Sequence, residues 1–155
     1  MALVTRVTVA VCDNLIMRVN VEVNKAIQYQ CDFDDEWDTT CPKAGDCEDY
    51  ALCKARKLLE AGVAPHRMEL VNYTQPSGVG HLVLVVNGLV LDNLTNGTVP
   101  VESLLAKSRP NYGCMLSGER VVYVAESDGS GYRKIKADQI GATPKCVKAL
   151  RQLGV

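Results

Sequence analysis

The stretch Gly45-Asp-Cys-Glu-Asp-Tyr-Ala-Leu-Cys-Lys-Ala-Arg-Lys-Leu-Leu-Glu-Ala-Gly62 contains the clearest helical pattern in the sequence. Its apolar residues recur every three or four positions along one stripe, namely Ala51, Leu52, Ala55, Leu58 and Leu59. Gly62 follows at the point where such a helix ends. The predicted first turn holds Asp46, Cys47, Glu48 and Asp49, where unpaired backbone N–H groups and the helix dipole favour negative charge.

Cys47 therefore occupies the N-terminus of a predicted helix. A thiolate is a much better nucleophile than a thiol, and backbone dipoles at a helix N-terminus lower the pKa of a cysteine. Cys47 is accordingly a candidate nucleophile. The alternative is that it is a small buried residue of the core, as many cysteines are.

The second informative stretch is His81-Leu-Val-Leu-Val-Val-Asn-Gly-Leu-Val-Leu-Asp92, in which Asn-Gly separates two apolar runs and predicts a hairpin with a two-residue turn. In that register Val86 faces Leu89 and Val83 faces Asp92. Because strand side chains alternate between faces, Asp92 shares a face with His81 and lies one diagonal step away. The sequence thus predicts a carboxylate–imidazole pair.

Such a pair suits a general base, because the carboxylate orients the imidazole and stabilises its charged form. Its alternative is a structural polar pair at a strand end. His66 is a competing base, but it follows Pro65 in a polar connection and is expected to face solvent.

The remaining patterns predict helices over 13–30, with Asp13 as its cap, over 101–107 and over 144–153. They predict further strands over 67–73, 120–126 and 132–136, and a structured acidic loop over 31–44. The expected fold is α+β, with one domain over residues 1–155 in which the Cys47 helix packs on an antiparallel sheet whose central hairpin carries His81 and Asp92.

Composition limits the choice of partners. A net charge of −1 provides no basic field for nucleic acid. No apolar run approaches the roughly 20 residues of a membrane-spanning helix, and the stretch 7–12 is too short for a signal-peptide core. We therefore expect a cytoplasmic protein, or a periplasmic one if a leader is missing; oligomeric state is not indicated.

The seven cysteines are an odd number without Cys-x-x-Cys spacing, which favours mostly reduced thiols. An alternative prediction is a metal site. Its ligands would be Cys41, Cys47 and Cys53 together with His66 or His81, although structural zinc sites have tighter spacing.

Four blocks together resemble the bacterial transglutaminase-like cysteine proteinases, a papain-related family that includes the periplasmic LapG-type proteases of surface adhesins. They are Gly45–Ala51, Leu58–Val63, Gly80–Leu84 and Leu89–Leu94, within a resemblance that covers roughly 19–112. The resemblance implies a papain-like, transglutaminase-like fold and a triad of Cys47 as nucleophile, His81 as base and Asp92 as orienting acid. The chain is shorter than expected for the family and lacks its secretion signal, which leaves adhesin as substrate in doubt.

The same resemblance implies calcium bound by the acids that flank the cysteine, Asp46 and Glu48, with Asp49 a less certain ligand. Asp32, Asp34, Asp35, Glu36 and Asp38 are possible additional ligands, or simply a solvated acidic loop. Trp37 resembles a tryptophan that the family places before its cysteine, and residues 37–41 are the region expected to supply an oxyanion donor or contact substrate.

These features predict a cysteine endopeptidase that hydrolyses a peptide bond in a protein substrate. Acyl transfer to an amine remains an alternative, because the same triad serves both reactions. A catalytically inactive calcium-binding or protein-binding module of the same fold is the other alternative.

Overall fold

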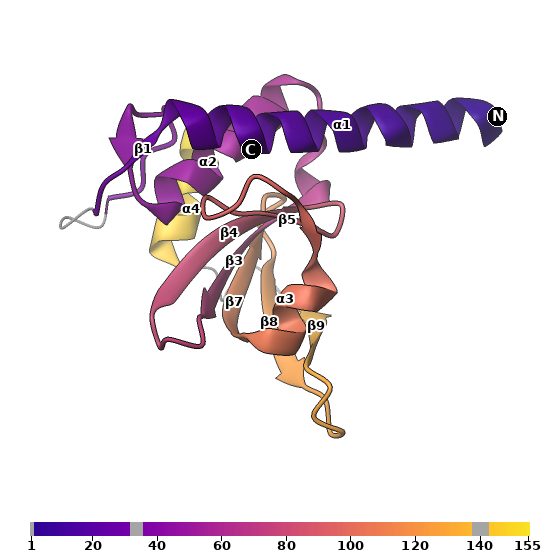
Figure 1. Cartoon of the computed structure of the whole chain (residues 1–155), viewed down its shortest axis with the longest axis vertical. Coiled ribbons are helices and arrows are strands. Elements are labelled where there is room, and N and C mark those ends of the chain that lie inside the picture. The colour runs from indigo at the N-terminus through magenta and orange to yellow at the C-terminus, as the bar shows by residue number, and fades with distance from the viewer. Residues whose placement is uncertain (1, 32–35, 138–142) are drawn as a thin grey trace.

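The computed structural model describes residues 2–31, 36–137 and 143–155 (Figure 1). The helices are α1 (Ala2–Ala26), α2 (Cys47–Glu60), α3 (Val101–Lys107) and α4 (Pro144–Leu153), with a 3-10 turn η1 (Pro65–Arg67). The strands are β1 (Gln28–Tyr29), β2 (Ala44–Gly45), β3 (Met68–Thr74), β4 (Gly80–Val86), β5 (Leu89–Leu91), β6 (Val99–Pro100), β7 (Arg109–Met115), β8 (Arg120–Ala125) and β9 (Tyr132–Lys136).

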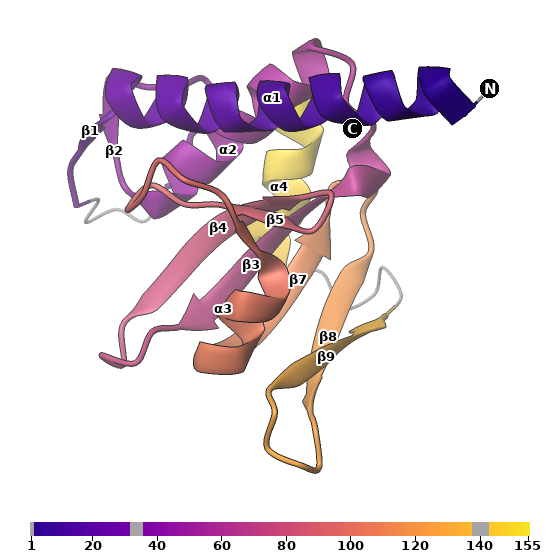
Figure 2. The ribbon, with the colours of Figure 1, turned by 45° about the vertical axis from the view of Figure 1, so that its right-hand side comes forward.

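Seven strands form an antiparallel sheet in the order β6-β5-β4-β3-β7-β8-β9, which Figure 2 shows as a curled surface. The hairpin β4–β5 therefore lies to one side of the sheet centre, which β3 occupies, and not at the centre as the sequence suggested. The short strands β1, which follows α1, and β2, which precedes α2, form a separate parallel pair.

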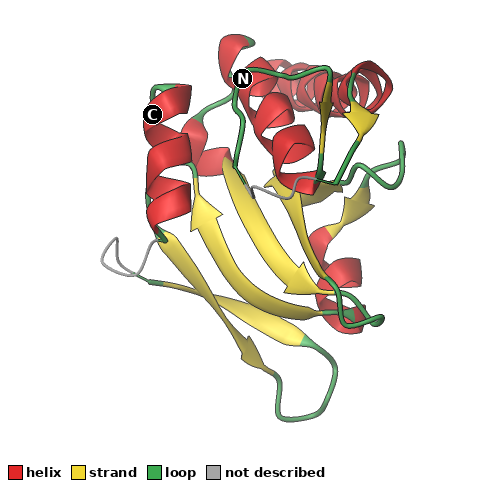
Figure 3. Ribbon diagram, turned by 90° about the vertical axis from the view of Figure 1, so that its left-hand side faces the viewer, coloured by secondary structure: helices red, strands yellow, loops and turns green. Residues whose placement is uncertain are grey.

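Alternating strand residues divide the core between the two faces of the sheet. Leu70, Leu82 and Leu84 face a large cluster built with α1, α2 and α4. Val71, Val83 and Val85 face a smaller cluster that is partly covered by α3. Figure 3 shows the three longer helices gathered together, apart from α3. The chain thus has the α+β architecture, with the Cys47 helix on an antiparallel sheet, that the sequence predicted.

The first helix differs from the prediction. It begins at Ala2 instead of after Asp13, so Asp13 lies inside the helix and is not its cap, and it ends at Ala26 instead of continuing to Gln30. The reason for the early end is that Gln28 and Tyr29 pair with Ala44 and Gly45. Although α1 is long, none of the helices in the described ranges is apolar enough over sufficient length to cross a membrane.

The cysteine prediction needs one correction. Cys41 and Cys53 form a disulfide, with their Cα atoms 4.7 Å apart, whereas Cys31, Cys47, Cys114 and Cys146 are free. The loop before α2 folds back along the helix, which places Cys41 beside Cys53, a contact that sequence spacing does not reveal. This bond also excludes the alternative metal site that required both thiolates.

Candidate active site

The β4–β5 hairpin has the register that the sequence predicted. Leu84, Val85 and Val86 pair with Leu91, Val90 and Leu89. Asn87 and Gly88 both have positive φ, at 50° and 78°, as a two-residue type I′ turn requires. Strand periodicity therefore places His81 and Asp92 on one face.

His81 and Asp92 are in direct contact. His81 Nε2 lies 2.8 Å from Asp92 Oδ1, and the two side chains are only 7% and 14% exposed. Asp92 Oδ1 also accepts the Leu94 N–H. The His81 hydrogen bond is the leading favourable contribution that holds the pKa of Asp92 below its usual value, against the opposing effect of burial. An ionised Asp92 accepts a hydrogen bond from the Nε2–H group, which leaves Nδ1 as the basic nitrogen.

Two further elements hold this pair. Tyr73 of β3 is the cross-strand partner of His81, and its ring packs edge-on against the imidazole, with centroids 5.5 Å apart and planes at 87°. On the other side, Asn24 of α1 donates from Nδ2 to the Asp92 carbonyl oxygen at 3.0 Å. The imidazole and the carboxylate are thus oriented by β3 and α1 together.

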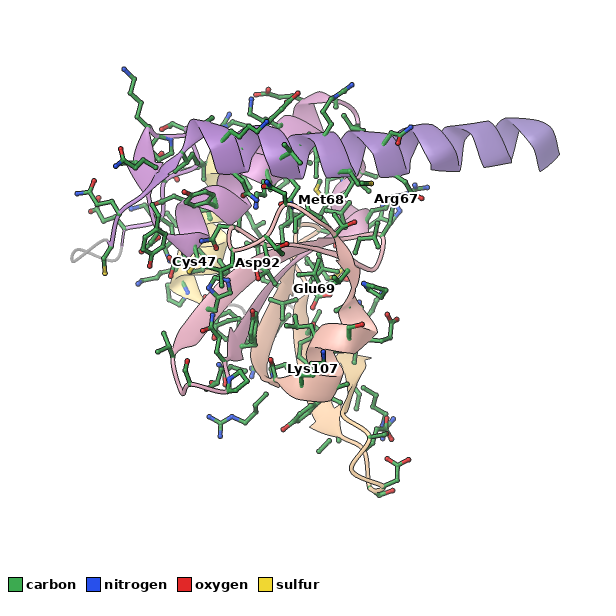
Figure 4. The ribbon with its side chains drawn as sticks, in the orientation of Figure 1. Cys47, Arg67, Met68, Glu69, Asp92 and Lys107 are labelled. Atoms are coloured by element: carbon green, nitrogen blue, oxygen red, sulfur yellow. A yellow bond between two sulfur atoms is a disulfide. The ribbon has the colours of Figure 1, made fainter. Side chains whose placement is uncertain are left out.

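Cys47 reaches this pair at the edge of the sheet. Strand β5 pairs with residues 84–86 of β4, so among the described residues no strand pairs with the first half of β4 on that side. There the backbone N–H of Leu82 donates to Cys47 Sγ. The charges of both Cys47 and Asp92 act on Tyr73, and Figure 4 shows Cys47 and Asp92 near each other. The first turn of α2 and the start of β4 therefore bring the three candidate catalytic residues to one place.

The pKa of Cys47 contradicts the prediction of a lowered value. Burial and the neighbouring Glu48 carboxylate raise the pKa of the Cys47 thiol to about 12, outweighing the Leu82 N–H, which lowers it. Glu48 Oε2 accepts a hydrogen bond from Cys47 Sγ at 3.3 Å. The helix start alone therefore does not produce a thiolate, and a base is needed to remove the proton.

The acids around Cys47 have different roles. Asp49 is buried and accepts the Asp46 N–H at 3.1 Å and the Asp38 N–H at 2.9 Å, one with each carboxylate oxygen. Asp46 and Asp49 form a reciprocal capping box at the start of α2. Asp49 is thus a cap residue that also fastens the preceding loop.

Carboxylate oxygens are the donors that calcium prefers, so Asp46 and Glu48 fit the ion by chemistry. Within 2–31, 36–137 and 143–155, however, no group of three or more acidic, histidine or cysteine side chains is arranged to hold a metal. Asp32, Asp34 and Asp35 lie outside the described residues. Glu36 and Asp38 line a cavity of about 280 Å³ together with Asp49, next to the start of α2.

Trp37 is half-buried and packs against the main core. It borders a cavity shared with Arg56, Lys148 and Gln152, on the side of α4. Among the described residues, the buried Trp37 Nε1 has no hydrogen-bond partner, so no hydrogen bond from it reaches Cys47.

His66, the competing base, is exposed in η1 and lines a cavity of about 580 Å³ together with Asn87 and Gly88, at the turn end of β4. His66 thus faces solvent, as the sequence predicted, and lies at the other end of β4 from Leu82, the residue that Cys47 contacts.

Lys54 is a site residue that sequence reasoning missed. Its side chain is completely buried, and Asp92 is the charged group that acts on it. The sequence did contain an indication that Lys54 is buried. Lys54 lies on the apolar stripe of α2, three residues after Ala51 and four before Leu58. A lysine on a buried face calls for an explanation in terms of a partner.

Comparison with known proteins agrees with this arrangement. The family model of the bacterial transglutaminase-like cysteine proteinases (BTLCP) matches residues 3–104, which include Cys47, His81 and Asp92. No curated protein matches the sequence significantly.

Among solved structures, the fold is similar to that of calcium-bound LapG of Legionella pneumophila, with a TM-score of 0.71 and 18% identity over 91% of this chain and 80% of that one. EGTA-treated LapG of the same organism matches with a TM-score of 0.70 and 20% identity over 92% and 79% of the two chains. The match in fold extends to most of both chains, beyond the segment that the family model covers. This chain belongs to the bacterial transglutaminase-like cysteine proteinase family.

Proposed function

We propose that the protein is a cysteine peptidase in which Cys47 is the nucleophile, His81 the general base and Asp92 the residue that orients the histidine. The observation that carries this proposal is the 2.8 Å contact between His81 Nε2 and Asp92 Oδ1 beside the strand edge that Cys47 faces. A buried carboxylate that fixes one imidazole nitrogen leaves the other available for proton transfer.

The reaction begins with transfer of the Cys47 thiol proton to His81 Nδ1 as Sγ attacks the carbonyl carbon of the substrate amide. Cys47 exchanges its hydrogen bond to Glu48 for one to His81 in this step. The imidazolium, stabilised by Asp92, then gives the proton to the amide nitrogen, the C–N bond breaks and a thioester remains. Water, deprotonated by His81, attacks the thioester, and the carboxylic acid product and the free thiol are released.

The negatively charged oxygen of the tetrahedral intermediate needs donors. The backbone N–H of Cys47 lies in the first turn of α2, where no intrahelical acceptor exists, and would supply one of them. A second donor from residues 37–41 remains part of the proposal. The substrate class is a protein or peptide, as the family description implies.

The test is mass-spectrometric mapping of iodoacetamide labelling at neutral pH. Cys47 should react faster than Cys31 even though it is half-buried and Cys31 is an exposed free cysteine, because His81 assists its deprotonation. His81→Ala should slow Cys47 labelling by about 100-fold, the lower end of the range for general-base catalysis.

His66→Ala is the matched control, since it removes the other histidine of the chain and should leave Cys47 labelling unchanged. Labelling of Cys47 no faster than that of Cys31, or equal in wild type and His81→Ala, would reject the assignment of His81 as base.

We also propose that calcium binds at the start of α2 through Asp46 and Glu48. Support comes from their carboxylate chemistry and from the calcium-bound form of the similarly folded LapG. Bound calcium would supply positive charge beside Cys47. Asp49 is the third acid of this turn, and each of its oxygens already accepts one backbone N–H group, so the proposal rests on Asp46 and Glu48.

Thermal unfolding with calcium, magnesium or chelator tests this binding without reference to activity. Calcium should raise the unfolding temperature of the wild type and not that of Asp46→Asn or Glu48→Gln, because binding to the folded state alone stabilises it. Glu60→Gln, at the exposed opposite end of α2, should respond as wild type. Equal calcium stabilisation in all four proteins would exclude these ligands.

A further inference from the structure

The most exposed large apolar side chains among the described residues are Leu94, Val79 and Tyr29, with exposed fractions of 67%, 60% and 59%. A single apolar residue on a protein surface is ordinary, whereas apolar residues that gather at one place indicate a binding surface. Each of these three residues lies beside a different member of the proposed triad.

Leu94 is attached to the catalytic pair through its backbone. Its N–H donates to Asp92 Oδ1 at 3.0 Å, and the same oxygen lies 2.8 Å from His81 Nε2. The side chain of Leu94 is nevertheless directed mostly to solvent. Leu94 is therefore an apolar surface residue that lies directly beside the pair.

The exposed loop that carries Leu94 is fastened to α1. Asn20, which is completely buried, donates from Nδ2 to the carbonyl oxygens of Thr95 and Asn96, at 3.1 and 3.0 Å. Asn24, one turn later on the helix, donates to the Thr95 carbonyl oxygen as well, at 3.1 Å. A binding residue that is already held in place loses less conformational freedom when a ligand arrives. The loop thus presents Leu94 in a fixed position.

Val79 lies on the other side of His81 along the chain. It precedes His81 by two positions, which is the spacing of neighbouring side chains on one face of a strand, and β4 begins between them at Gly80. The turn before β4 is closed by the Gln75 N–H, which donates to the Val79 carbonyl oxygen at 2.9 Å. This turn holds Val79 at the start of the strand that carries His81.

Tyr29 lies beside the start of the nucleophile helix. Its partner in the parallel pair β1–β2 is Gly45, two residues before Cys47. The next residue, Gln30, donates its N–H to the Gly45 carbonyl oxygen at 2.8 Å. Burial, followed by the charges of Cys31 and Cys47, raises the pKa of the Tyr29 hydroxyl, which agrees with this placement.

We infer that Tyr29, Val79 and Leu94 form an apolar rim around the proposed active site, and that this rim binds apolar side chains next to the scissile amide of the substrate. His81 and Asp92 are mostly buried, so the exposed rim offers the apolar surface that a polypeptide can cover. Removal of that surface from water drives the contact. The inference rests on the proposed function, because it names the kind of residue that the peptidase accepts.

The test compares two reagents that carry the same iodoacetyl group, N-iodoacetyl-leucine amide and N-iodoacetyl-serine amide. The ratio of their labelling rates at Cys47, divided by the same ratio for glutathione, cancels the reactivity of the thiol and reports recognition of the side chain. The leucine reagent should label Cys47 about 10-fold faster, the lower end of the range by which a hydrophobic pocket discriminates one methylene group. The combined variant Tyr29→Ser, Val79→Ser and Leu94→Ser should lose this preference.

The matched control replaces three exposed apolar residues of other segments, Val124, Ile135 and Val155, by serine, and it should keep the preference. Equal rates of the two reagents in wild type, or a preference that survives in the rim variant, would overturn the inference. The wild-type comparison needs no variant, and the single substitution Leu94→Ser tests the rim if the combined variant does not fold.

The rim and the catalytic assignment can fail separately. Iodoacetamide labelling of wild type and His81→Ala decides whether His81 activates Cys47, whereas the ratio of the two amide reagents decides whether the rim recognises apolar groups. Loss of the preference in the rim variant, with Cys47 indifferent to His81→Ala, would leave the rim standing and reject the peptidase mechanism. Equal rates of the two reagents at a Cys47 that depends on His81 would do the reverse.

Discussion

Glu48 is the residue whose charge most directly opposes activation of Cys47. Its carboxylate lies 3.3 Å from Cys47 Sγ, and after burial it is the largest cause of the raised thiol pKa. A neutral amide in its place removes the repulsion that a thiolate would experience. We therefore expect Glu48→Gln to lower the pKa of Cys47 from about 12, so that more thiolate is present at a given pH.

The pH dependence of iodoacetamide labelling at Cys47, measured without calcium, checks this expectation. The rate should begin to rise at lower pH in Glu48→Gln than in wild type. Glu60→Gln, which removes an acid from the other end of the same helix, serves as control. A Glu48→Gln profile that coincides with the wild-type profile would contradict this role of Glu48.

Lys54 makes stability depend on pH. Burial lowers the pKa of Lys54 from 10.5 to about 7 in the folded protein, so between these values the unfolded state binds more protons and the free energy of unfolding rises with pH. At and below about pH 7 the buried ammonium destabilises the fold, by on the order of 5 kcal/mol at 1.36 kcal/mol per pKa unit.

Lys54→Met should therefore be more stable than wild type at about pH 6, with the difference shrinking toward about pH 10. Urea unfolding across this range measures the effect, and the difference between the two proteins isolates Lys54 from other titrating groups. A constant difference at all pH values would show that Lys54 keeps an ordinary pKa in the fold.

At the scale of the element, the start of α2 depends on a glycine. A Cβ added at Gly45 would lie 2.3 Å from Asp49 Oδ2 and 2.7 Å from Asp49 Cβ. Gly45→Ala would therefore displace the side chain that caps α2 and fastens the Asp38 backbone. We expect a loss of about 1 to 3 kcal/mol of stability, the usual cost of overpacking.

Thermal or urea unfolding of Gly45→Ala measures this loss. Gly97→Ala is the matched control, because a Cβ at Gly97 would meet no atom within 4 Å and the backbone there is not in the left-handed region. Equal stability of the Gly45 and Gly97 variants would mean that α2 does not need the Asp49 cap.

At the scale of the whole molecule, the Cys41–Cys53 disulfide joins the loop before the nucleophile to the body of α2. Closing a loop of sequence separation 12 restricts the unfolded chain, which stabilises a fold by about 2 to 4 kcal/mol. Cys41→Ala in a Cys53→Ala background should therefore unfold at lower denaturant concentration than wild type.

The control is Cys31→Ala, which removes an exposed free cysteine and should not change stability. A reducing agent should destabilise the wild type but not the variant that lacks both Cys41 and Cys53. If reduction leaves the wild-type transition where it was, the disulfide contributes nothing to folding.

The sequence by itself determined the features that follow from local geometry. The apolar stripe of α2 and the Asn87–Gly88 turn identified helix and hairpin. Because side chains of a strand alternate strictly, that turn also determined the contact between His81 and Asp92. The strands β6 and β7 had no comparable pattern, since Pro110 and Gly113 interrupt the alternation of β7.

Only the tertiary structure decided the properties that depend on packing between distant segments. It placed Cys47 at the open edge of β4, where burial and Glu48 raise its pKa, although the helix start suggested the opposite. It joined Cys41 to Cys53 and buried Lys54 completely. Local periodicity specifies which face a residue occupies, whereas the dielectric environment and charge around a side chain come from every element that closes over it.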